Sequence, residues 1–279
     1  MTTPIAATPL VNQVNESLLV TLYIRAMETL RPDALIQDEK AVALMSQMDY
    51  PFNTRIKKLH LNETNKLVIV LRNREFDRYT QGFLARYPKA VVVHIGCGLD
   101  TRFDRVDNGL VEWFDLDLPE IIKIRRILIS DEKLHYHLLP YSVLDKAWLP
   151  EVNTYRNRHF LFLAEGVFMY LLGGQVKWLI RTLLDQFRGP ELVFDAYSPV
   201  HVLVSNLQTA SLGFQCRWGI WRGREIEGWG EGIRLLDQWG YMDPPEPRLH
   251  PIRWLKPVES LFRTLRIYHF QLGKSEGSD

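Results

Sequence analysis

The chain has 279 residues, of which 46% are hydrophobic and 24% charged, and a formal net charge of +1, as is ordinary for one α/β domain or two small ones. So small a charge excludes the strongly basic surface of most nucleic-acid-binding proteins, and the two cysteines, Cys97 and Cys216, form neither a disulfide framework nor a metal motif. No apolar run approaches the ~20 residues of a membrane span and the first residues lack a signal-peptide pattern, so we expect a cytoplasmic protein with no metal, membrane or nucleic-acid partner.

Two helices are expected before the first clear strand. Residues 16–30 carry their apolar side chains on one stripe, and Pro32 follows them. Residues 65–87 repeat apolar side chains at helical spacing until Pro88 ends the pattern.

From residue 90 onward, short apolar strands alternate with helices. The run Ala90–Ile95 is β-branched and ends at Gly96, which is typical of a buried parallel strand. Further strands are expected over residues 111–114, 136–139, 160–164, 192–196 and 266–272, with the clearest helices over residues 119–128 and 175–187. The alternation predicts an α/β fold, a Rossmann-like, doubly wound and mostly parallel sheet, which binds ligands beyond the carboxyl ends of its strands.

The alternation breaks over residues 197–232. This segment holds three of the eight tryptophans and six glycines, a composition that favours neither a strand nor a good helix. We expect an inserted loop or lid here. A short helix is expected to follow over Ile233–Trp239, with Gly240 as its stop.

The first strand runs into a Gly-x-Gly turn formed by Gly96 and Gly98. Glycines without side chains allow a ligand to approach the backbone, whose N–H groups then face it. Two acidic residues, Asp115 and Asp117, follow Gly98 after 17 and 19 positions. A strand, a glycine turn and a later acid together indicate a nucleoside-binding site, in which the acid accepts hydrogen bonds from ribose hydroxyls.

A nicotinamide dehydrogenase shares this layout, so the residues of the turn must show whether the cofactor is a dinucleotide or another nucleoside. The dinucleotide fingerprint requires a third glycine where this chain has Thr101. Asp100 precedes it, and a carboxylate at the mouth of the turn would repel a pyrophosphate but tolerate a sulfonium or ammonium group. S-adenosylmethionine is therefore the expected cofactor.

Five blocks in order make the chain similar to a known family. They are RNREFD (72–77), VVHIGCGLDTR (92–102), WFDLDLPEI (113–121), YSVLDKAWL (141–149) and AEGVFMYL (164–171). With YIRAME (23–28) they resemble the leucine carboxyl methyltransferase family, and more closely its polyketide, tetracenomycin-type O-methyltransferase branch. The resemblance covers about residues 16–187 and implies a class I methyltransferase fold that uses S-adenosyl-L-methionine.

The resemblance also implies roles for cofactor-binding residues. Arg72 would hold the methionyl carboxylate, with Arg25 as a second cation. Gly96 and Gly98 would form the turn beside the methionyl portion. Asp117 would bind the ribose hydroxyls, although spacing alone also allows Asp115.

At the adenine, Ser142 and Val143 stand where the family has an Asp-Leu pair. Asp145 is a substitute acceptor, because a hydroxyl replaces the family's carboxylate at position 142. Glu165 corresponds to the family's strand-end glutamate at the cofactor. A carboxylate at the end of a buried strand usually has a ligand or a partner, which favours a role for Glu165 on physical grounds as well.

The acceptor is the open question. An acceptor carboxylate is already ionised, whereas a phenol benefits from a general base, for which His201 and Tyr197 are candidates. The aromatic residues after the fourth and fifth strands either wall an acceptor pocket or pack the insertion onto the domain; they are Phe168, Tyr170, Phe214, Trp218, Trp221 and Trp229. Nearby arginines that would meet an acceptor carboxylate are Arg217, Arg222 and Arg224.

These observations predict an N-terminal helical cap over residues 1–88 and a methyltransferase domain over 89–279, with an acceptor lid at about 197–232. The expected reaction is methyl transfer to a carboxyl or hydroxyl oxygen of a small, polyketide-like acceptor. The alternatives are a protein C-terminal carboxyl methyltransferase, a non-catalytic binding module on the same fold and, last, a dehydrogenase. The oligomeric state is not predicted.

Overall fold

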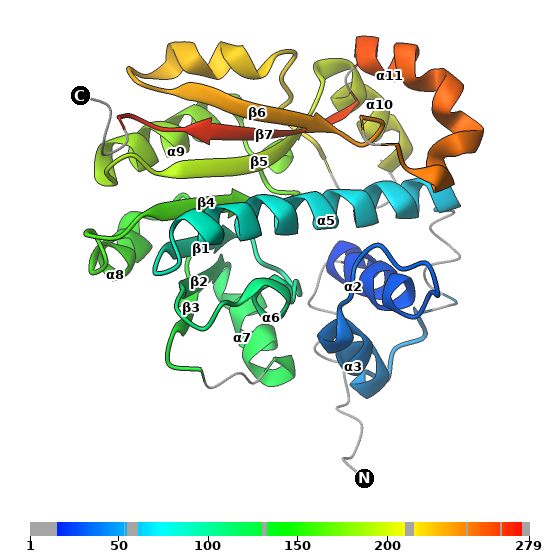
Figure 1. Ribbon diagram of the computed structural model, residues 1–279, viewed down its shortest axis with the longest axis horizontal. Helices are drawn as coiled ribbons and strands as arrows, with labels where there is room; N and C mark the ends of the chain where they lie inside the picture. The colour runs from blue at the N-terminus through cyan, green and yellow to red at the C-terminus, as the bar shows by residue number, and fades with distance from the viewer. Residues whose placement is uncertain are drawn as a thin grey trace.

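A computed structural model describes residues 16–52, 54, 61–129, 133–209, 215–243, 245–262 and 264–274. In this part of the chain a seven-stranded sheet has the order β3-β2-β1-β4-β5-β7-β6 (Figure 1). Its strands are β1 (Val91–Ile95), β2 (Glu112–Asp117), β3 (Tyr136–Pro140), β4 (Phe160–Ala164), β5 (Glu191–Tyr197), β6 (Arg234–Gly240) and β7 (Leu265–Gln271). The first five run parallel, whereas β7 is antiparallel to both β5 and β6. The predicted mostly parallel, doubly wound sheet is therefore confirmed.

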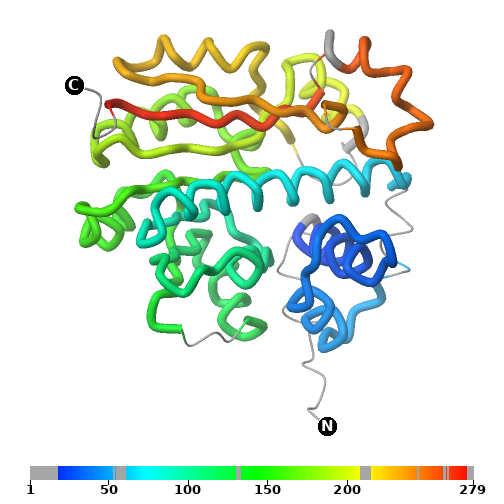
Figure 2. Tube along the Cα trace, in the orientation of Figure 1, coloured from blue at the N-terminus to red at the C-terminus, as the bar shows by residue number. Residues whose placement is uncertain are grey.

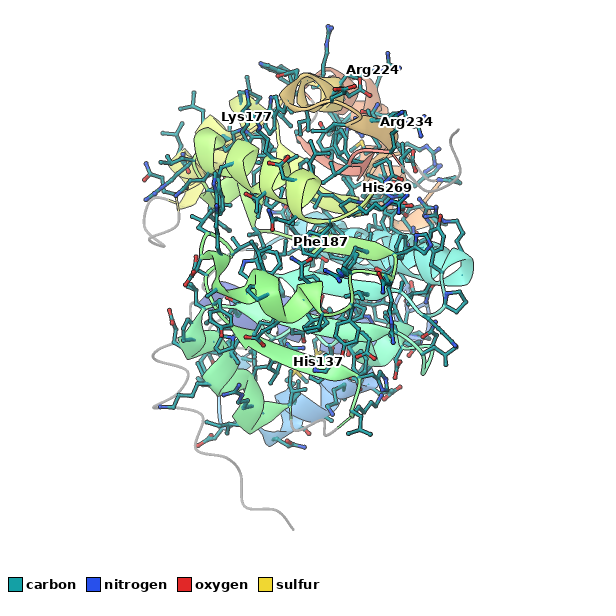
Figure 3. The ribbon with its side chains drawn as sticks, turned by 90° about the vertical axis from the view of Figure 1, so that its left-hand side faces the viewer. His137, Lys177, Phe187, Arg224, Arg234 and His269 are labelled. Atoms are coloured by element: carbon teal, nitrogen blue, oxygen red, sulfur yellow. The ribbon has the colours of Figure 1, made fainter. Side chains whose placement is uncertain are left out.

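Helices cover both faces of the sheet. Figure 3 looks along the sheet from the amino ends of its parallel strands, with α8 and α9 on one side and α5 on the other. The α-helices are α2 (Glu16–Thr29), α3 (Glu39–Gln47), α5 (Glu63–Arg86), α6 (Arg102–Val106), α7 (Pro119–Leu128), α8 (Leu149–Asn153), α9 (Gly173–Gln186), α10 (Pro199–Thr209) and α11 (Lys256–Phe262). Short 3₁₀ helices are η1 (Lys146–Trp148), η2 (Phe168–Tyr170), η4 (Gly223–Trp229) and η5 (Pro247–Leu255).

The central strands are buried on both faces, which explains why they are apolar runs rather than alternating ones. On one face, Val91 and Val93 share a core with the stripe of α9. On the other, Val92 shares a core with the stripe of α5. Each fully buried aliphatic side chain contributes roughly 1.5–3 kcal/mol relative to exposure, so these two cores hold the strand ends in place.

Helices α2 and α3 lie beyond the carboxyl ends of the parallel strands (Figure 2). Their apolar side chains pack against Leu99, just after the β1 turn, and against α7. Helix α5, by contrast, packs along the sheet and shares its core. A division of the chain into two domains at residue 88 stays a prediction. Helix α5 precedes that residue, yet its side chains share a core with the sheet.

Two expectations about the C-terminal part are wrong. Residues expected as a short helix, Ile233–Trp239, form strand β6 instead, which pairs with β7 along its length. Their helix-favouring composition is overridden because β7 offers an unpaired edge, and edge pairing satisfies the backbone better than an isolated turn of helix. The segment expected to be irregular contains helix α10, which begins at Pro199, a favoured first residue of a helix.

The remaining predicted elements are confirmed within two residues at most boundaries, and α7 has the predicted bounds. No helix of the described residues is long and apolar enough to cross a membrane.

Candidate cofactor and acceptor site

The strand order reverses between β1 and β4, and the candidate site lies at the carboxyl ends of these neighbours. Gly96 and Gly98 follow β1 with φ of 65° and 51°, and Gly166 follows β4 with φ of 68°. All three have the left-handed backbone conformation that favours glycine. A Cβ at position 98 would lie 2.7 Å from Leu18 Cδ2 of α2, so the turn and the N-terminal helix are in close contact.

Asp117 is the last residue of β2, beside the glycine turn. Its Oδ2 accepts a hydrogen bond from the Gly98 N–H at 2.8 Å, and its Oδ1 accepts one from Leu118 N–H at 2.7 Å. Burial raises the pKa of this carboxyl above its ordinary value, and the two backbone donors oppose that shift. The side chain is half-buried, so it still borders open space at the strand end.

Asp115, the other candidate for the ribose, lies two residues earlier on β2 and is fully buried. It accepts hydrogen bonds from Trp113 Nε1 at 2.8 Å and from Tyr136 Oη at 2.5 Å, and it is paired with Arg125. Burial alone would raise the pKa of Asp115, but the Arg125 guanidinium and His94 outweigh it and lower the pKa. With its lone pairs already used, Asp115 is a weaker candidate for a ligand than Asp117.

Arg72 reaches the site from α5. Its Nε donates to Glu165 at 2.8 Å and its Nη1 to Asp195 at 3.0 Å. Nη2 makes no hydrogen bond within the described part of the chain, so two N–H groups are left for an anion. The structure thus brings together Arg72 and Glu165, which are 93 positions apart.

Glu165 receives more partners than the strand end alone suggests. Arg102 pairs with its second oxygen at 2.5 Å, and the neighbouring Asn73 donates to its first at 3.1 Å. Burial opposes the ionisation of Glu165, but the two guanidiniums lower its pKa. This carboxylate is therefore ionised at neutral pH and held in one position.

Asp100 does not lie open at the mouth of the turn, as the sequence argument against a pyrophosphate assumed. It is buried and pairs with Arg102 at 3.0 Å and with Arg105 at 3.2 Å. These arginines hold the pKa of Asp100 well below its ordinary range in spite of burial. Three arginines, Arg25 included, surround the carboxylate, because a buried anion is stable only when it is paired.

Arg25 is also buried within this network. Its Nε donates to Asp38 at 2.9 Å and its Nη2 to the Leu99 carbonyl at 2.7 Å. These contacts anchor α2 to the turn after β1. Its role as a second cation for the methionyl carboxylate stays a prediction.

In the linked arginine–carboxylate pairs, the carboxylates outnumber the guanidiniums by one, and His94 Nε2 lies 3.9 Å from Asp100. Within the described residues, ion pairs connect four guanidiniums to five carboxylates; they are Arg25, Arg72, Arg102 and Arg105, and Asp38, Asp77, Asp100, Glu165 and Asp195. Burial raises the pKa of Asp195, which lies near the carboxyl end of β5. In addition, the buried Asn73 Oδ1 has no hydrogen-bond partner. A cationic ligand with N–H donors, such as the ammonium and sulfonium of S-adenosylmethionine, fits this excess and this acceptor.

The predicted adenine residues lie after β3. Ser142 is half-buried and its Oγ accepts from Leu144 N–H at 3.3 Å, while Val143 packs against the core. Asp145 is exposed, and its side chain accepts from Ala147 N–H at 2.9 Å as the cap of η1. The carboxylate of Asp145 is thus occupied by the cap, and the adenine contacts stay a prediction.

Tyr197 and His201 lie together at the end of β5 and the start of α10. Their ring centroids are 4.6 Å apart. Burial raises the pKa of the Tyr197 phenol, so it stays protonated at neutral pH, and burial lowers the pKa of His201, so its imidazole is neutral. Of the two candidate bases, only His201 is in the form that accepts a proton.

The tryptophans of the insertion divide between core and surface. Trp218 and Trp229 have ring centroids 6.3 Å apart and pack against the apolar core beside α9. Trp221 is exposed, and Phe214 lies outside the described residues. Packing therefore accounts for two of these rings. The three neighbouring arginines are exposed as well, with Arg224 on η4 near the β6 edge (Figure 3).

A model of the leucine carboxyl methyltransferase family matches residues 18–184. The chain belongs to this family. It is 32% identical over 235 residues to "Tetracenomycin polyketide synthesis O-methyltransferase TcmP" of Streptomyces glaucescens, covering 83% of this chain and 84% of that protein. It is 29% identical to "S-adenosyl-L-methionine-dependent methyltransferase dpfgK" of Gibberella zeae, with 80% of each chain covered. As a member of the family, it is a methyltransferase that uses S-adenosylmethionine.

Solved structures agree on the fold. A DUF574 family protein from Streptomyces avermitilis is 13% identical with a TM-score of 0.57, over 91% of this chain and 96% of that one. A protein from Thermobifida fusca is 18% identical with a TM-score of 0.56, over 90% and 94% of the two chains. At these identities the likeness concerns the fold alone.

Sequence reasoning missed Asp195, Arg102 and Asn73. Asp195 interrupts the apolar strand LVFDAY, and a charge inside a buried strand is a signal that could have marked it. Arg102 lay inside the LDTR block but received no role. Asn73 adjoins Arg72, and nothing in the sequence showed that it faces Glu165.

Proposed function

We propose that this S-adenosylmethionine-dependent O-methyltransferase methylates a carboxyl or hydroxyl oxygen of a small, polyketide-like acceptor. The cofactor end of the site rests on one observation, the excess carboxylate beside a turn of left-handed glycines, which suits a cationic nucleoside. The acceptor class rests on the relative from Streptomyces glaucescens, whose printed name places it in polyketide synthesis.

In the proposed complex, the chain holds the cofactor by residues from three strand ends and from α5. Asp117 accepts the ribose hydroxyls, since both of its oxygens keep lone pairs beyond their backbone donors. Gly96 and Gly98 leave room for the methionyl portion. Arg72 offers Nη2 to the carboxylate, and Glu165 keeps that guanidinium in place.

When bound, S-adenosylmethionine supplies a methyl group on a positively charged sulfur. The chain's own contribution is to align an acceptor oxygen with that methyl group and to exclude water, since methyl transfer is an in-line displacement. For a hydroxyl acceptor, the neutral His201 imidazole takes the proton of the acceptor. For a carboxyl acceptor, no base is needed at neutral pH.

Exposed apolar side chains lie on the segments that follow β4 and β5. On α10 they are Val200, Leu203, Val204 and Leu207, and on the segment after β4 they are Tyr170 and Leu172. An apolar, flat acceptor would cover such side chains, which supports a small aromatic acceptor.

The test is transfer of tritium from S-adenosyl-[methyl-³H]methionine to three acceptors. These are an aromatic polyketide carboxylic acid, a phenolic polyketide without a carboxyl group, and a peptide that ends in leucine. Alkali releases a methyl ester as volatile methanol and leaves an aryl methyl ether intact, so the label identifies the oxygen. Labelling of the peptide alone would contradict the proposal and favour a protein carboxyl methyltransferase, and binding without labelling of any acceptor would favour a non-catalytic module.

A further inference from the structure

The Gly98 carbonyl of the turn is held by a buried guanidinium. Arg125 of α7 is 1% exposed, and its Nη1 donates to Gly98 O at 2.9 Å. The Gly98 N–H donates to Asp117 Oδ2 at 2.8 Å. Both polar backbone groups of the glycine are thus engaged, so neither adjoining peptide can rotate without the loss of a hydrogen bond.

Arg125 is itself fixed on its other nitrogens. Its Nη2 pairs with Asp115 at 2.5 Å, and its Nε donates to Tyr136 Oη at 3.0 Å. Tyr136 donates in turn to Asp115. A planar guanidinium with three occupied edges has one orientation, which a lysine ammonium could not reproduce.

We infer that Arg125 is a positioning residue of the cofactor site. It acts through the Gly98 backbone to keep the Asp117 carboxylate directed at the place where the cofactor ribose binds, and it does not touch the ligand. The inference rests on the proposed role of Asp117. Its physical basis is that Asp117, at the end of its strand, has no side-chain partner among the described residues and takes its orientation from the N–H groups of Gly98 and Leu118.

The test separates positioning from folding by two variants that share one substitution. Asp115→Asn leaves Arg125 and its bond to Gly98 but removes the counter-charge of a buried cation. Asp115→Asn with Arg125→Gln removes the cation too, so the double variant unfolds at a higher temperature than the single one. The double variant also lacks the guanidinium that holds Gly98.

The dissociation constant of S-adenosylhomocysteine is measured by calorimetry for wild type and both variants, together with thermal unfolding. We expect the double variant to bind about tenfold more weakly than Asp115→Asn although it is the more stable of the two, because the turn is then free to rotate. A purely structural role predicts the opposite, with affinity that follows stability. Equal affinity of the double variant and wild type would overturn the inference.

Arg125→Lys provides a second route if Asp115→Asn does not fold, since it keeps the charge and loses the three-way contact. We expect the same weakening by about tenfold, and wild-type affinity in this variant would also overturn the inference. Failure of the proposed site itself has a different signature. In that case Asp117→Asn binds S-adenosylhomocysteine as wild type does, whatever the Arg125 variants show.

Discussion

Asp115 and Asp117 lie two positions apart on β2, and their replacement by asparagine is expected to separate folding from cofactor binding. Asp117→Asn keeps the size of the side chain but removes its charge, and its amide NH₂ must face one of two backbone N–H groups. A hydrogen bond to a charged group contributes ~1.5–3 kcal/mol, so the dissociation constant of S-adenosylhomocysteine should rise roughly 10- to 150-fold. Stability should change little, because burial already disfavours the ionised form of Asp117 in the folded state.

Asp115→Asn should have the reverse effect. The substitution leaves the fully buried Arg125 without its carboxylate and loses the charge that Trp113 and Tyr136 donate to. Removal of one partner of a buried ion pair costs about 3–5 kcal/mol, which corresponds to a fall in Tm of roughly 6–20 °C for a chain of this size. The folded fraction should bind S-adenosylhomocysteine within about threefold of wild type, since Arg125 still holds the glycine turn.

The assays are calorimetric titration with S-adenosylhomocysteine and thermal unfolding followed by circular dichroism. Asp185→Asn, at an exposed position of α9, is the matched control and should change neither quantity. The reasoning is refuted if Asp117→Asn binds as tightly as wild type, or if Asp115→Asn loses tenfold in affinity with its Tm unchanged.

Four further outcomes are expected. Gly98→Ala should lower stability by ~1–2 kcal/mol, because position 98 has a left-handed φ and the new Cβ would contact Leu18. Adding Leu18→Ala should relieve the contact but not the backbone strain, and thermal unfolding of both variants measures the difference. Because the pKa of Asp117 is raised in the folded state, affinity for S-adenosylhomocysteine should fall as pH falls through that pKa, which lies above the pH at which an ordinary aspartate protonates. The contribution of Asp117 to stability should rise over the same pH window, because the folded state binds the proton more tightly than the unfolded state. Calorimetry from pH 7.5 to 4.5 checks the affinity, and a pH dependence retained in Asp117→Asn would contradict this prediction. Glu165→Gln should destabilise by ~3–5 kcal/mol, since its two arginine partners lose their shared carboxylate, and an unchanged urea midpoint would contradict that. Trp218→Ala should cost ~2–3 kcal/mol, less than a fully buried tryptophan, and a change below 1 kcal/mol would mean that the ring does not support the core.

Local sequence determined most of the fold and the position of the turn. Several features are set by short segments of sequence alone. They are the buried run after Pro88, the two glycines with left-handed φ and the helix that begins at Pro119. The methyltransferase family could be identified for the same reason, since each of its blocks is contiguous in sequence. Strand β6 could not be predicted, because Arg234–Gly240 becomes a strand only by pairing with β7.

The partners of the site's charged side chains depended on the tertiary structure. Spacing left Asp115 and Asp117 equivalent, and only the packing of α7 against β2 buried Asp115 beside Arg125. Likewise Asp100 looked open in sequence, whereas folding surrounds it with three arginines from two helices. Charge pairing acts between residues far apart in the chain, and burial decides which carboxylates must be paired and which border a ligand, so neither follows from sequence distance.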